Sequence, residues 1–400
     1  MKNWITYNLA DICTNIYSGG TPSTKHPEYW GGNLKWLSSG ETSQKFIYDT
    51  QRKITEAGVN NSSTKLAHKN SVVIATAGQG YTRGQVSFLM TDTYMNQSVI
   101  ACQPDERKVL PLYLYYNLDS RYAELRLLSD GTSTRGGLSG RILKKMEILL
   151  PSIEEQSKIV AMLYSLDKKV EINESINKNL EKQALSIYKA WFCDYILSNG
   201  IRPSTWASTT IKDLSSLIVR GITPQYEENT NQLVLNQKCI REHAINIALA
   251  RHHRPKQNNK KWIMKGDLLI NSTGTGTLGR VAQVWFEPQN MTVDSHITIV
   301  RPKKAVLQNY IGFWGLSHED EIEALHTGST GQTELPRERV QALSLLLPDD
   351  GILKKFNSLI DPITSSIVAN KKEIFRLSQI RDTLLPKLIS GKLDISDIKI

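Results

Sequence analysis

The sequence has few cysteines and no long apolar run, and each absence excludes a class of protein. Its 400 residues include four cysteines, Cys13, Cys102, Cys193 and Cys239, which lie far apart and form no CxxC pair. Zinc ribbons and thioredoxin-like redox sites require such pairs and are therefore excluded. Sparse, unpaired cysteines are typical of a reducing cytosol, so we expect a cytoplasmic protein.

Segments that enter membranes are absent too. The sequence contains no run of about 18 apolar residues, which is the length that a membrane-spanning helix needs. The N-terminal stretch MKNWITYNLADI has no apolar segment of signal-peptide length. We expect no membrane partner and no secretion signal.

Catalytic motifs are missing as well. The sequence has no GxxxxGK(S/T), HExxH or GxSxG motif, and it lacks the proline–proline dipeptide of amino-methyltransferases. Asp105 follows a proline but lies directly beside Glu106 and Lys108, whereas a nuclease site needs such groups on separate strands. His243, His252 and His253 have no acidic or cysteine ligand at a helpful spacing. We expect no catalytic residues, no metal site and no cofactor bound by this chain.

What the sequence does contain is basic charge and a duplication. Lysine and arginine outnumber aspartate and glutamate by 49 to 39, which gives a net charge of +10 and favours a polyanionic partner such as nucleic acid. LADICTNIYSGGTP at 9–22 matches IKDLSSLIVRGITP at 211–224. From Tyr113 and Tyr310 onward the two copies keep a constant offset of 197 residues. The chain is therefore two copies of one unit.

One GxGxxG motif occurs, between Gly274 and Gly279. Taken alone it suggests a dinucleotide-binding loop, which needs a helix directly after it. The residues that follow, RVAQVWF, alternate like a strand, and in the first copy the spacing slips to GxGxxxG between Gly78 and Gly84. We interpret both segments as glycine turns between strands.

Each copy ends in a segment whose seam positions alternate in spacing by four and three, which predicts a left-handed coiled coil. The seam runs from 159 to 191, and adding 197 gives 356 to 388 in the same register. Each helix of about 37 residues would span about 55 Å. The seam residues are Ile159, Leu163, Leu166, Val170, Asn173, Leu180, Phe356, Ile360, Ile363, Ile367, Asn370 and Leu377.

Two asparagines, Asn173 and Asn370, occupy equivalent seam positions, and Ala184 is equivalent to Arg381. Buried polar seam residues commonly fix the register of a coiled coil at some cost in stability. In an antiparallel pair centred near them, the two asparagines would face each other. The alternative is that both lie in a solvated, loosely packed stretch.

These patterns predict an α+β fold with an internal pseudo-two-fold. Residues 1–150 and 198–347 form two globular domains, because short β-rich runs alternate there with turns such as SGGTP. Residues 151–197 and 348–400 form two long helices that pair as an antiparallel coiled coil. The helices and domain ends of the copies match, while 23–70 and 225–266 barely align. A constant frame with divergent inserts suits a reader of two different DNA sequences.

The segment ARHHRPKQNNKKWIMK at 250–265 holds six basic residues and no acidic one. Lysine and arginine neutralise phosphates, while arginine, asparagine and glutamine read base edges. The alternative is a solvated loop. The candidate DNA-binding residues here are Arg251, His252, His253, Arg254, Lys256, Asn258, Lys260 and Lys261.

Two glycine-rich segments of the first copy, 78–84 and 130–137, combine small residues and hydroxyls with one arginine each. Glycine lets backbone approach a phosphate, and the hydroxyls and arginine donate hydrogen bonds, although ordinary turns also produce such strings. The candidates are Gln79, Tyr81, Thr82, Arg83, Thr132, Ser133, Thr134 and Arg135. Their second-copy counterparts are Thr275, Thr277, Arg280, Ser329, Thr330 and Gln332.

Three motifs resemble one family. LPSIEEQSKIV at 150–160, YKAWFCDY at 188–195 and LLPKLISGKLD at 384–394 are similar to segments of the specificity subunits (HsdS) of type I restriction-modification systems. The resemblance covers the whole chain. One departure is the second junction, LPDDGILKKF, which lacks the EEQ element and puts the start of the second helix in question.

The resemblance implies a non-catalytic subunit of a methyltransferase/endonuclease complex. Each globular domain would be a target-recognition domain that reads one half of a split sequence in double-stranded DNA, and the helices would set the spacer. The chain would dock two modification subunits, which bind S-adenosylmethionine, and restriction (translocase) subunits, which use ATP and Mg.

Three rival interpretations remain open. A self-contained DNA methyltransferase or nuclease would show activity from the purified chain, and the missing motifs argue against it. A structural scaffold would bind proteins through its paired helices without a DNA sequence preference. An anti-restriction decoy would occupy the modification subunit.

Overall fold

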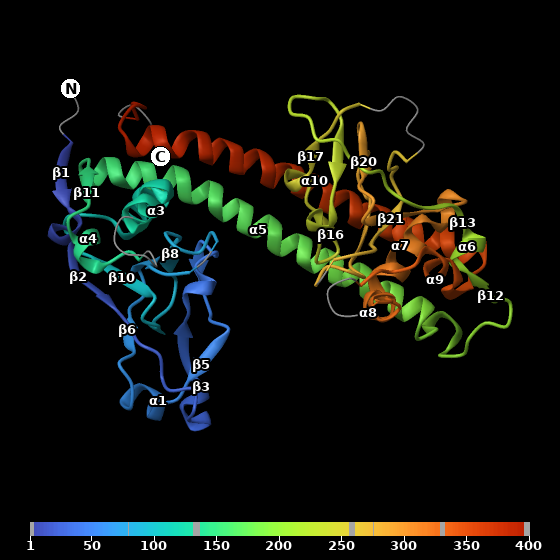
Figure 1. Ribbon diagram of the computed structural model, residues 1–400, viewed down its shortest axis with the longest axis horizontal. Coiled ribbons are helices and arrows are strands. Elements are labelled where there is room, and N and C mark those ends of the chain that lie inside the picture. The colour runs from blue at the N-terminus through green and yellow to red at the C-terminus, as the bar shows by residue number, and fades with distance from the viewer. Residues whose placement is uncertain are drawn as a thin grey trace. The chain divides into compact units, whose positions relative to one another are not determined.

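The structure is a computed structural model that describes residues 4–78, 80–130, 137–255, 261–274, 276–328 and 333–395. The chain divides into two compact units. Unit 1 consists of residues 1–171 and 375–400, and unit 2 consists of residues 172–374. The division passes through two helices of 40 residues, α5 (Ile153–Phe192) and α10 (Asp350–Ile389), so that each unit holds part of both (Figure 1).

Unit 1 contains a five-stranded sheet in the order β2-β10-β7-β8-β4, a four-stranded sheet in the order β5-β3-β9-β6, and the pair β1-β11. Its strands are β1 Ile5–Asn8, β2 Cys13–Ser18, β3 Trp30–Leu37, β4 Phe46–Ile47, β5 Arg52–Ile54, β6 Lys65–Ala67, β7 Val72–Ala75, β8 Val86–Leu89, β9 Thr93–Met95, β10 Val99–Pro104 and β11 Glu147–Leu150. Its shorter helices are α1 Glu56–Asn60, α2 Pro111–Asp119, α3 Tyr122–Asp130 and α4 Gly140–Lys144.

Unit 2 contains a four-stranded sheet in the order β13-β21-β18-β19, a three-stranded sheet β17-β14-β20, and the pairs β12-β22 and β15-β16. Its strands are β12 Ala207–Thr210, β13 Ser215–Arg220, β14 Leu233–Leu235, β15 Ile240–Arg241, β16 Ala244–Ile245, β17 Arg251–His252, β18 Leu268–Asn271, β19 Val281–Gln283, β20 Met291–Val293, β21 Ile297–Pro302 and β22 Ser344–Leu347. Its shorter helices are α6 Ile211–Leu214, α7 Gln308–Ser317, α8 Glu319–Ala324 and α9 Arg337–Ala342.

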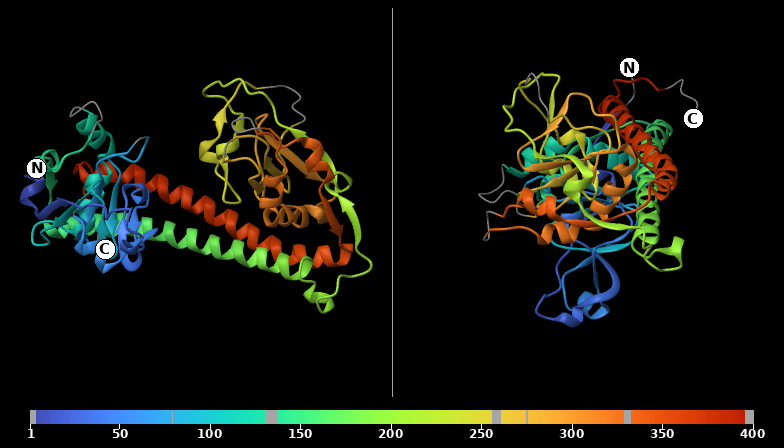
Figure 2. Two further views of the ribbon diagram at one scale, coloured as in Figure 1. Left: turned by 60° about the horizontal axis from the view of Figure 1, so that its bottom comes forward. Right: turned by 90° about the vertical axis from the view of Figure 1, so that its right-hand side faces the viewer.

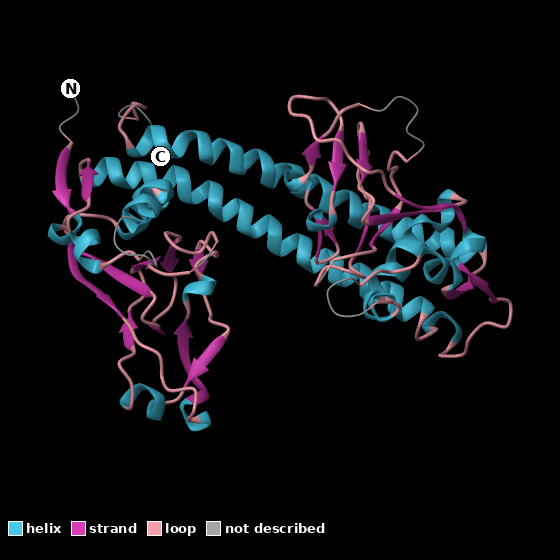
Figure 3. Cartoon of the chain, in the orientation of Figure 1, coloured by secondary structure: helices cyan, strands magenta, loops and turns pink. Residues whose placement is uncertain are grey.

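The strand order repeats between the two units. The order β2-β10-β7-β8 in unit 1 corresponds to β13-β21-β18-β19 in unit 2, and the pair β1-β11 corresponds to β12-β22. The parallel pairs β3-β9 and β14-β20 also correspond. The duplication inferred from the sequence is therefore present in the strand order. Figure 3 distinguishes the helices and strands of the chain by colour.

Both long helices begin and end at equivalent residues. Ser152 caps α5, because its hydroxyl accepts a hydrogen bond from the backbone N–H of Glu155 at 3.2 Å. Gln156 of the EEQ element is buried and joins α5 to the preceding loops through Leu110, Lys108 and Pro151. The second junction lacks this element, yet α10 starts at Asp350, which is 197 residues after Ile153. The missing glutamine therefore leaves the start of α10 unchanged.

The predicted seam residues all face the interior of their units to some degree. Ile159, Leu163, Asn173, Phe356, Ile360 and Ile367 are buried, while Leu166, Val170, Leu180, Ile363, Asn370 and Leu377 are half-buried. In unit 1 the start of α5 packs in one apolar cluster with the end of α10, and in unit 2 the end of α5 packs with the start of α10. Within each unit the two helix segments lie side by side (Figure 2).

The two seam asparagines do not bond to each other. Asn173 is 2% exposed and donates from Nδ2 to Oε2 of Glu373 at 2.8 Å. Asn370 donates from Nδ2 to Oδ1 of Asn177 at 2.9 Å. Both side chains are thus hydrogen-bonded between the helices of unit 2, which argues against a loosely packed, solvated stretch. In the described part of the chain, no helix is long and apolar enough to cross a membrane.

Phe356 provides a test of the contribution of the helix core to stability. Its ring is fully buried and contacts the rings of Tyr188, Phe192 and Phe313. We expect Phe356→Ala to lower the free energy of unfolding of unit 2 by about 3–5 kcal/mol, because it leaves a cavity among these rings. Urea unfolding measures the loss. Leu359→Ala, at a 45% exposed position of the same helix, is the control, and an equal loss in both variants would contradict the packing described.

Candidate nucleic-acid interface

The glycine-rich segments form hairpin loops in both units. β7 and β8 pair antiparallel around the loop of unit 1, and β18 and β19 pair antiparallel around the loop of unit 2. Each loop holds three glycines with positive φ, for example Gly84 at 88° and Gly279 at 84°. A Cβ on Gly279 would lie 2.5 Å from the Cβ of Glu323, so no other residue fits there. A strand follows each loop, which confirms a turn between strands rather than a dinucleotide-binding loop.

In each unit the leucine that follows the second predicted segment contacts the residue at the start of the glycine-rich hairpin loop through the same backbone hydrogen bond. In unit 1 the N–H of Leu138 donates to the carbonyl of Thr76 at 3.1 Å. In unit 2 the equivalent N–H of Leu335 donates to the carbonyl of Ser272 at 2.8 Å. The structure thus brings together, in each unit, two residues that lie more than 60 positions apart in the sequence.

In unit 1 two side chains of helix α3 hold the glycine loop by hydrogen bonds to its backbone carbonyls. The Tyr122 hydroxyl donates to the carbonyl of Tyr81 at 2.9 Å, and the Arg126 guanidinium donates to the carbonyl of Gly80 at 2.8 Å. The Tyr81 ring is 83% exposed, while Thr82 and Arg83 are half-buried. The other predicted residues of this unit, Gln79, Thr132, Ser133, Thr134 and Arg135, lie outside the described residues.

In unit 2 the basic segment forms the edge strand β17 and exposes most of its described residues. The Arg251 guanidinium lies 3.3 Å from the centre of the exposed Tyr226 ring. This cation–π contact keeps the positive charge of Arg251 at the surface. His252 and Arg254 are also exposed, and Arg254 pairs with Glu227 at 3.3 Å. Lys256, Asn258, Lys260, Thr275, Ser329, Thr330 and Gln332 lie outside the described residues.

Two predicted residues of unit 2 face inward instead. His253 is 0% exposed, so it packs in the interior and does not present its ring to a DNA groove, which corrects the prediction for this residue. Thr277 is half-buried, and its hydroxyl donates to Oε1 of Gln237 at 3.1 Å and thereby holds the glycine loop. Arg280, at the end of the loop, is half-buried.

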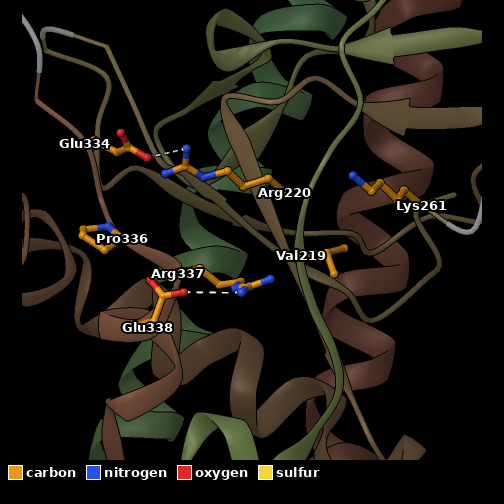
Figure 4. Close-up of a pocket in the computed structure, with 7 residues that line it drawn as sticks. All are labelled: Val219, Arg220, Lys261, Glu334, Pro336, Arg337 and Glu338. Carbon is orange, nitrogen blue, oxygen red and sulfur yellow. Dashed lines mark hydrogen bonds and ion pairs between the residues drawn. The ribbon is translucent and has the colours of Figure 1, made fainter.

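A shallow pocket of unit 2 is lined by one predicted residue, Lys261, and by residues near the end of β13 and the start of α9 (Figure 4). Lys261 lines it from the basic segment, and Glu334 lines it from the second loop while bridging backbone to Thr273 of the glycine loop. Arg220 and Arg337 supply two further cations. Nη1 of Arg220 lies 2.6 Å from Oε1 of Glu334, so an anionic ligand would compete with this carboxylate for the arginine.

Sequence reasoning missed several of these groups. Arg220 ends a β-strand and Arg337 begins a short helix, and neither position stands out from ordinary surface charge. In unit 1 the Arg52 guanidinium lies 3.6 Å from the centre of the Trp30 ring. This pair falls in the stretch 23–70, where divergence between the copies was the one available signal. In the described part of the chain, no group of three or more potential metal ligands occurs.

His243 anchors the hairpin β15-β16 of unit 2 to two carboxylates. Its Nδ1 lies 3.0 Å from Oε1 of Glu181 on α5, and its Nε2 lies 3.7 Å from Oε2 of Glu319 on α8. The hydrogen bond to Glu181 and the two negative charges raise the pKa of His243 above 6.5, although burial opposes the shift. Burial lowers the pKa of Lys371, while the charge of Glu181 acts in the opposite direction.

Comparison with known proteins places this geometry in a family. A family model for the Type I restriction modification DNA specificity domain matches residues 1–182. The specificity subunit of type I restriction enzyme MjaIX from Methanocaldococcus jannaschii is 27% identical over 422 aligned positions, which cover 99% of this chain and 95% of that protein. The EcoR124I/EcoR124II specificity subunit from Escherichia coli is 31% identical over 172 positions, which cover 42% of this chain and 41% of that protein.

A solved structure shares the fold along the whole chain. The crystal structure of the type I restriction-modification system S subunit from M. genitalium superimposes with a TM-score of 0.59 at 16% identity, covering 99% of this chain and 97% of that chain. Residues 1–182 therefore match the description of a type I restriction modification DNA specificity domain. The full-length similarities confirm the resemblance to specificity subunits, which are the non-catalytic components of type I restriction-modification systems.

The His243 contacts predict a pH-dependent stability of unit 2. Because the folded-state pKa is raised, the stabilisation is fully present below about pH 6.5 and is lost as the pH rises through the raised pKa. We expect the difference in melting temperature between the wild type and His243→Gln to be largest near pH 6 and to shrink toward pH 9. Thermal melts across this range measure it, with exposed His326→Gln as the control. A difference that does not change with pH would contradict the assignment.

Proposed function

We propose that this chain is the DNA-reading specificity subunit of a type I restriction-modification enzyme and that it reads a bipartite target, one half-site per unit. One observation carries the proposal. In each unit the start of a glycine-rich hairpin loop bonds to an equivalent leucine, Leu138 or Leu335, through the same backbone contact, on a strand order that repeats between the units. A repeated reading surface with divergent inserts suits two different half-sequences.

The proposed domains follow the sequence boundaries. Residues 1–150 and 198–347 are the two target-recognition domains, and 151–197 and 348–400 are the helical segments. We propose that α5 and α10 pair as an antiparallel coiled coil with an internal pseudo-two-fold. The asparagine contacts support this pairing, because Asn173 meets Glu373 whereas the later residue Asn177 meets the earlier residue Asn370.

The helices would then set the distance between the two half-sites. A pseudo-two-fold reader suits half-sites about one turn of DNA apart. In this proposal the exposed arginines of unit 2 contact phosphates and base edges, and the Tyr81 loop does so in unit 1. The chain docks two modification subunits, which carry S-adenosylmethionine, and restriction subunits, which use ATP and Mg. It binds none of these cofactors itself and acts in the cytoplasm.

Three rivals predict different behaviour. A scaffold or a decoy binds its protein partners without selecting a DNA sequence, and its affinity for DNA is unrelated to the loops. A self-contained enzyme modifies or cleaves DNA without other subunits. Selection of a split consensus from a random DNA pool by the purified chain favours the proposed function over the scaffold and the decoy. Absence of modification or cleavage of that DNA by the purified chain favours it over the self-contained enzyme.

Arg251 offers the most direct test of the reading surface. If its guanidinium contacts a phosphate, we expect Arg251→Ala to weaken binding to the selected DNA and to reduce the slope of log affinity against log salt by about 1. If it contacts a guanine, the loss is about 1–3 kcal/mol and specificity relaxes at one position in one half-site. Fluorescence anisotropy at several salt concentrations measures both, and Arg376→Ala, at an exposed position of α10, is the control. Unchanged affinity, slope and consensus would contradict the assignment of Arg251.

A further inference from the structure

A buried carboxylate, Asp167 of α5, joins three other parts of unit 1. Its side chain is 2% exposed. Oδ1 accepts hydrogen bonds from Nη1 of Arg381 on α10 at 2.7 Å and from Nζ of Lys45 at 3.2 Å, and Oδ2 accepts one from the Tyr116 hydroxyl at 2.9 Å. The Arg381 side chain is 12% exposed and also bonds to Asp382 at its outer edge.

The equivalent positions in unit 2 carry no charge. At the constant offset of 197 residues, Asp167 corresponds to Thr364, Arg381 to Ala184 and Tyr116 to Phe313. All three residues of unit 2 are buried. The Thr364 hydroxyl bonds to the carbonyl of Ile360 in its own helix, and the Phe313 ring stacks on Trp285. At equivalent positions between α5 and α10, unit 1 therefore buries an ion pair, whereas unit 2 buries uncharged side chains.

A buried ion pair discriminates between partners because each charge is costly without the other. When α5 pairs with α10, Asp167 meets Arg381. If α5 paired instead with α5 of a second copy, and the helices kept the same register, Ala184 would take the place of Arg381. Asp167 would then have no arginine on the opposite helix. If α10 paired with a second α10, Arg381 would meet Thr364.

We propose that the Asp167–Arg381 pair selects the partner of each long helix, so that α5 pairs with α10 and the duplicated helices do not pair with copies of themselves. The inference rests on the proposed coiled-coil pairing. The duplication makes pairing between identical helices of two chains possible, because α5 and α10 share one seam pattern and are nearly interchangeable. A polar contact at one seam position is a known way to specify pairing at some cost in stability. Asp167 and Arg381 are thus positioning residues for the two recognition domains.

Moving the arginine from one helix to the other tests the inference in the full-length chain. Ala184→Arg combined with Arg381→Ala gives Asp167 an arginine partner in the α5–α5 pairing and removes it from the α5–α10 pairing. Two differently tagged copies are co-expressed, and the fraction that co-purifies is measured together with the mass in solution. We expect the double variant to mix at least several-fold more than the wild type, whereas Arg381→Lys, which keeps a cation opposite Asp167, stays as unmixed as the wild type.

Equal mixing of the wild type and the arginine-relocated variant overturns the proposal. If the arginine-relocated variant does not fold, a double-mutant cycle of melting temperatures tests the proposal instead. Asp167→Thr and Arg381→Ala should each lower the melting temperature of unit 1 by about 6 °C or more, because each removes the 2.7 Å ion pair and leaves the remaining buried charge with its weaker charged partner alone, Asp382 for Arg381 or Lys45 for Asp167. The double variant, which copies the residues of unit 2, should recover most of the loss, and additive losses overturn the proposal. These measurements use no DNA, so a failure of the proposed function in the DNA-selection assay is distinguishable from a failure here.

Discussion

The structure depends on a stripe of apolar residues that recurs every 3.5 residues along two helices of 40 residues each. A helix of this length cannot bury such a stripe alone. Each unit solves the problem by packing a segment of α5 and a segment of α10 against its own sheets. Each globular part is therefore packed on segments of both helices, and the proposed reader of two half-sites requires its binding surfaces to stand on such rigid elements.

The variable parts lie on this constant frame. The strand order and the helix boundaries repeat between the units, whereas the basic strand β17 with its Tyr226 contact and the Arg52–Trp30 pair belong to one unit each. Loops change at little cost to the fold, while seam and sheet residues are constrained by packing. A duplicated chain can therefore keep its architecture and still present two different surfaces to DNA.

Periodicity and repetition made much of the fold predictable from the sequence. The two long helices, the repeated strand order and the glycine turns follow from sequence patterns, and the structure contains each of them. Arg220, Arg337 and Lys261 line one pocket only because the tertiary fold brings three distant segments together, and no local sequence pattern predicts this. Asp167 lies outside the 4-3 seam series, so in the sequence it resembles a surface charge. Its partner Arg381 was the only sequence signal of the ion pair, because a charged residue is unusual at a seam position. His253 follows two exposed residues but points inward, which a count of basic residues does not predict.

The central claim is that the paired helices hold two DNA readers at a fixed distance. Its most direct test maps adenine methylation genome-wide in cells that express the neighbouring modification subunit with no copy of this chain, with the wild type, or with a variant carrying four extra residues near Asn173 in α5 and near Asn370 in α10. Four residues add about 6 Å to a helix, which corresponds to about one or two base pairs at 3.4 Å each. The account predicts methylation only when the chain is present, at a split motif whose halves are unchanged and whose spacer lengthens in the variant. An unsplit motif, methylation without the chain, or an unchanged spacer would contradict it.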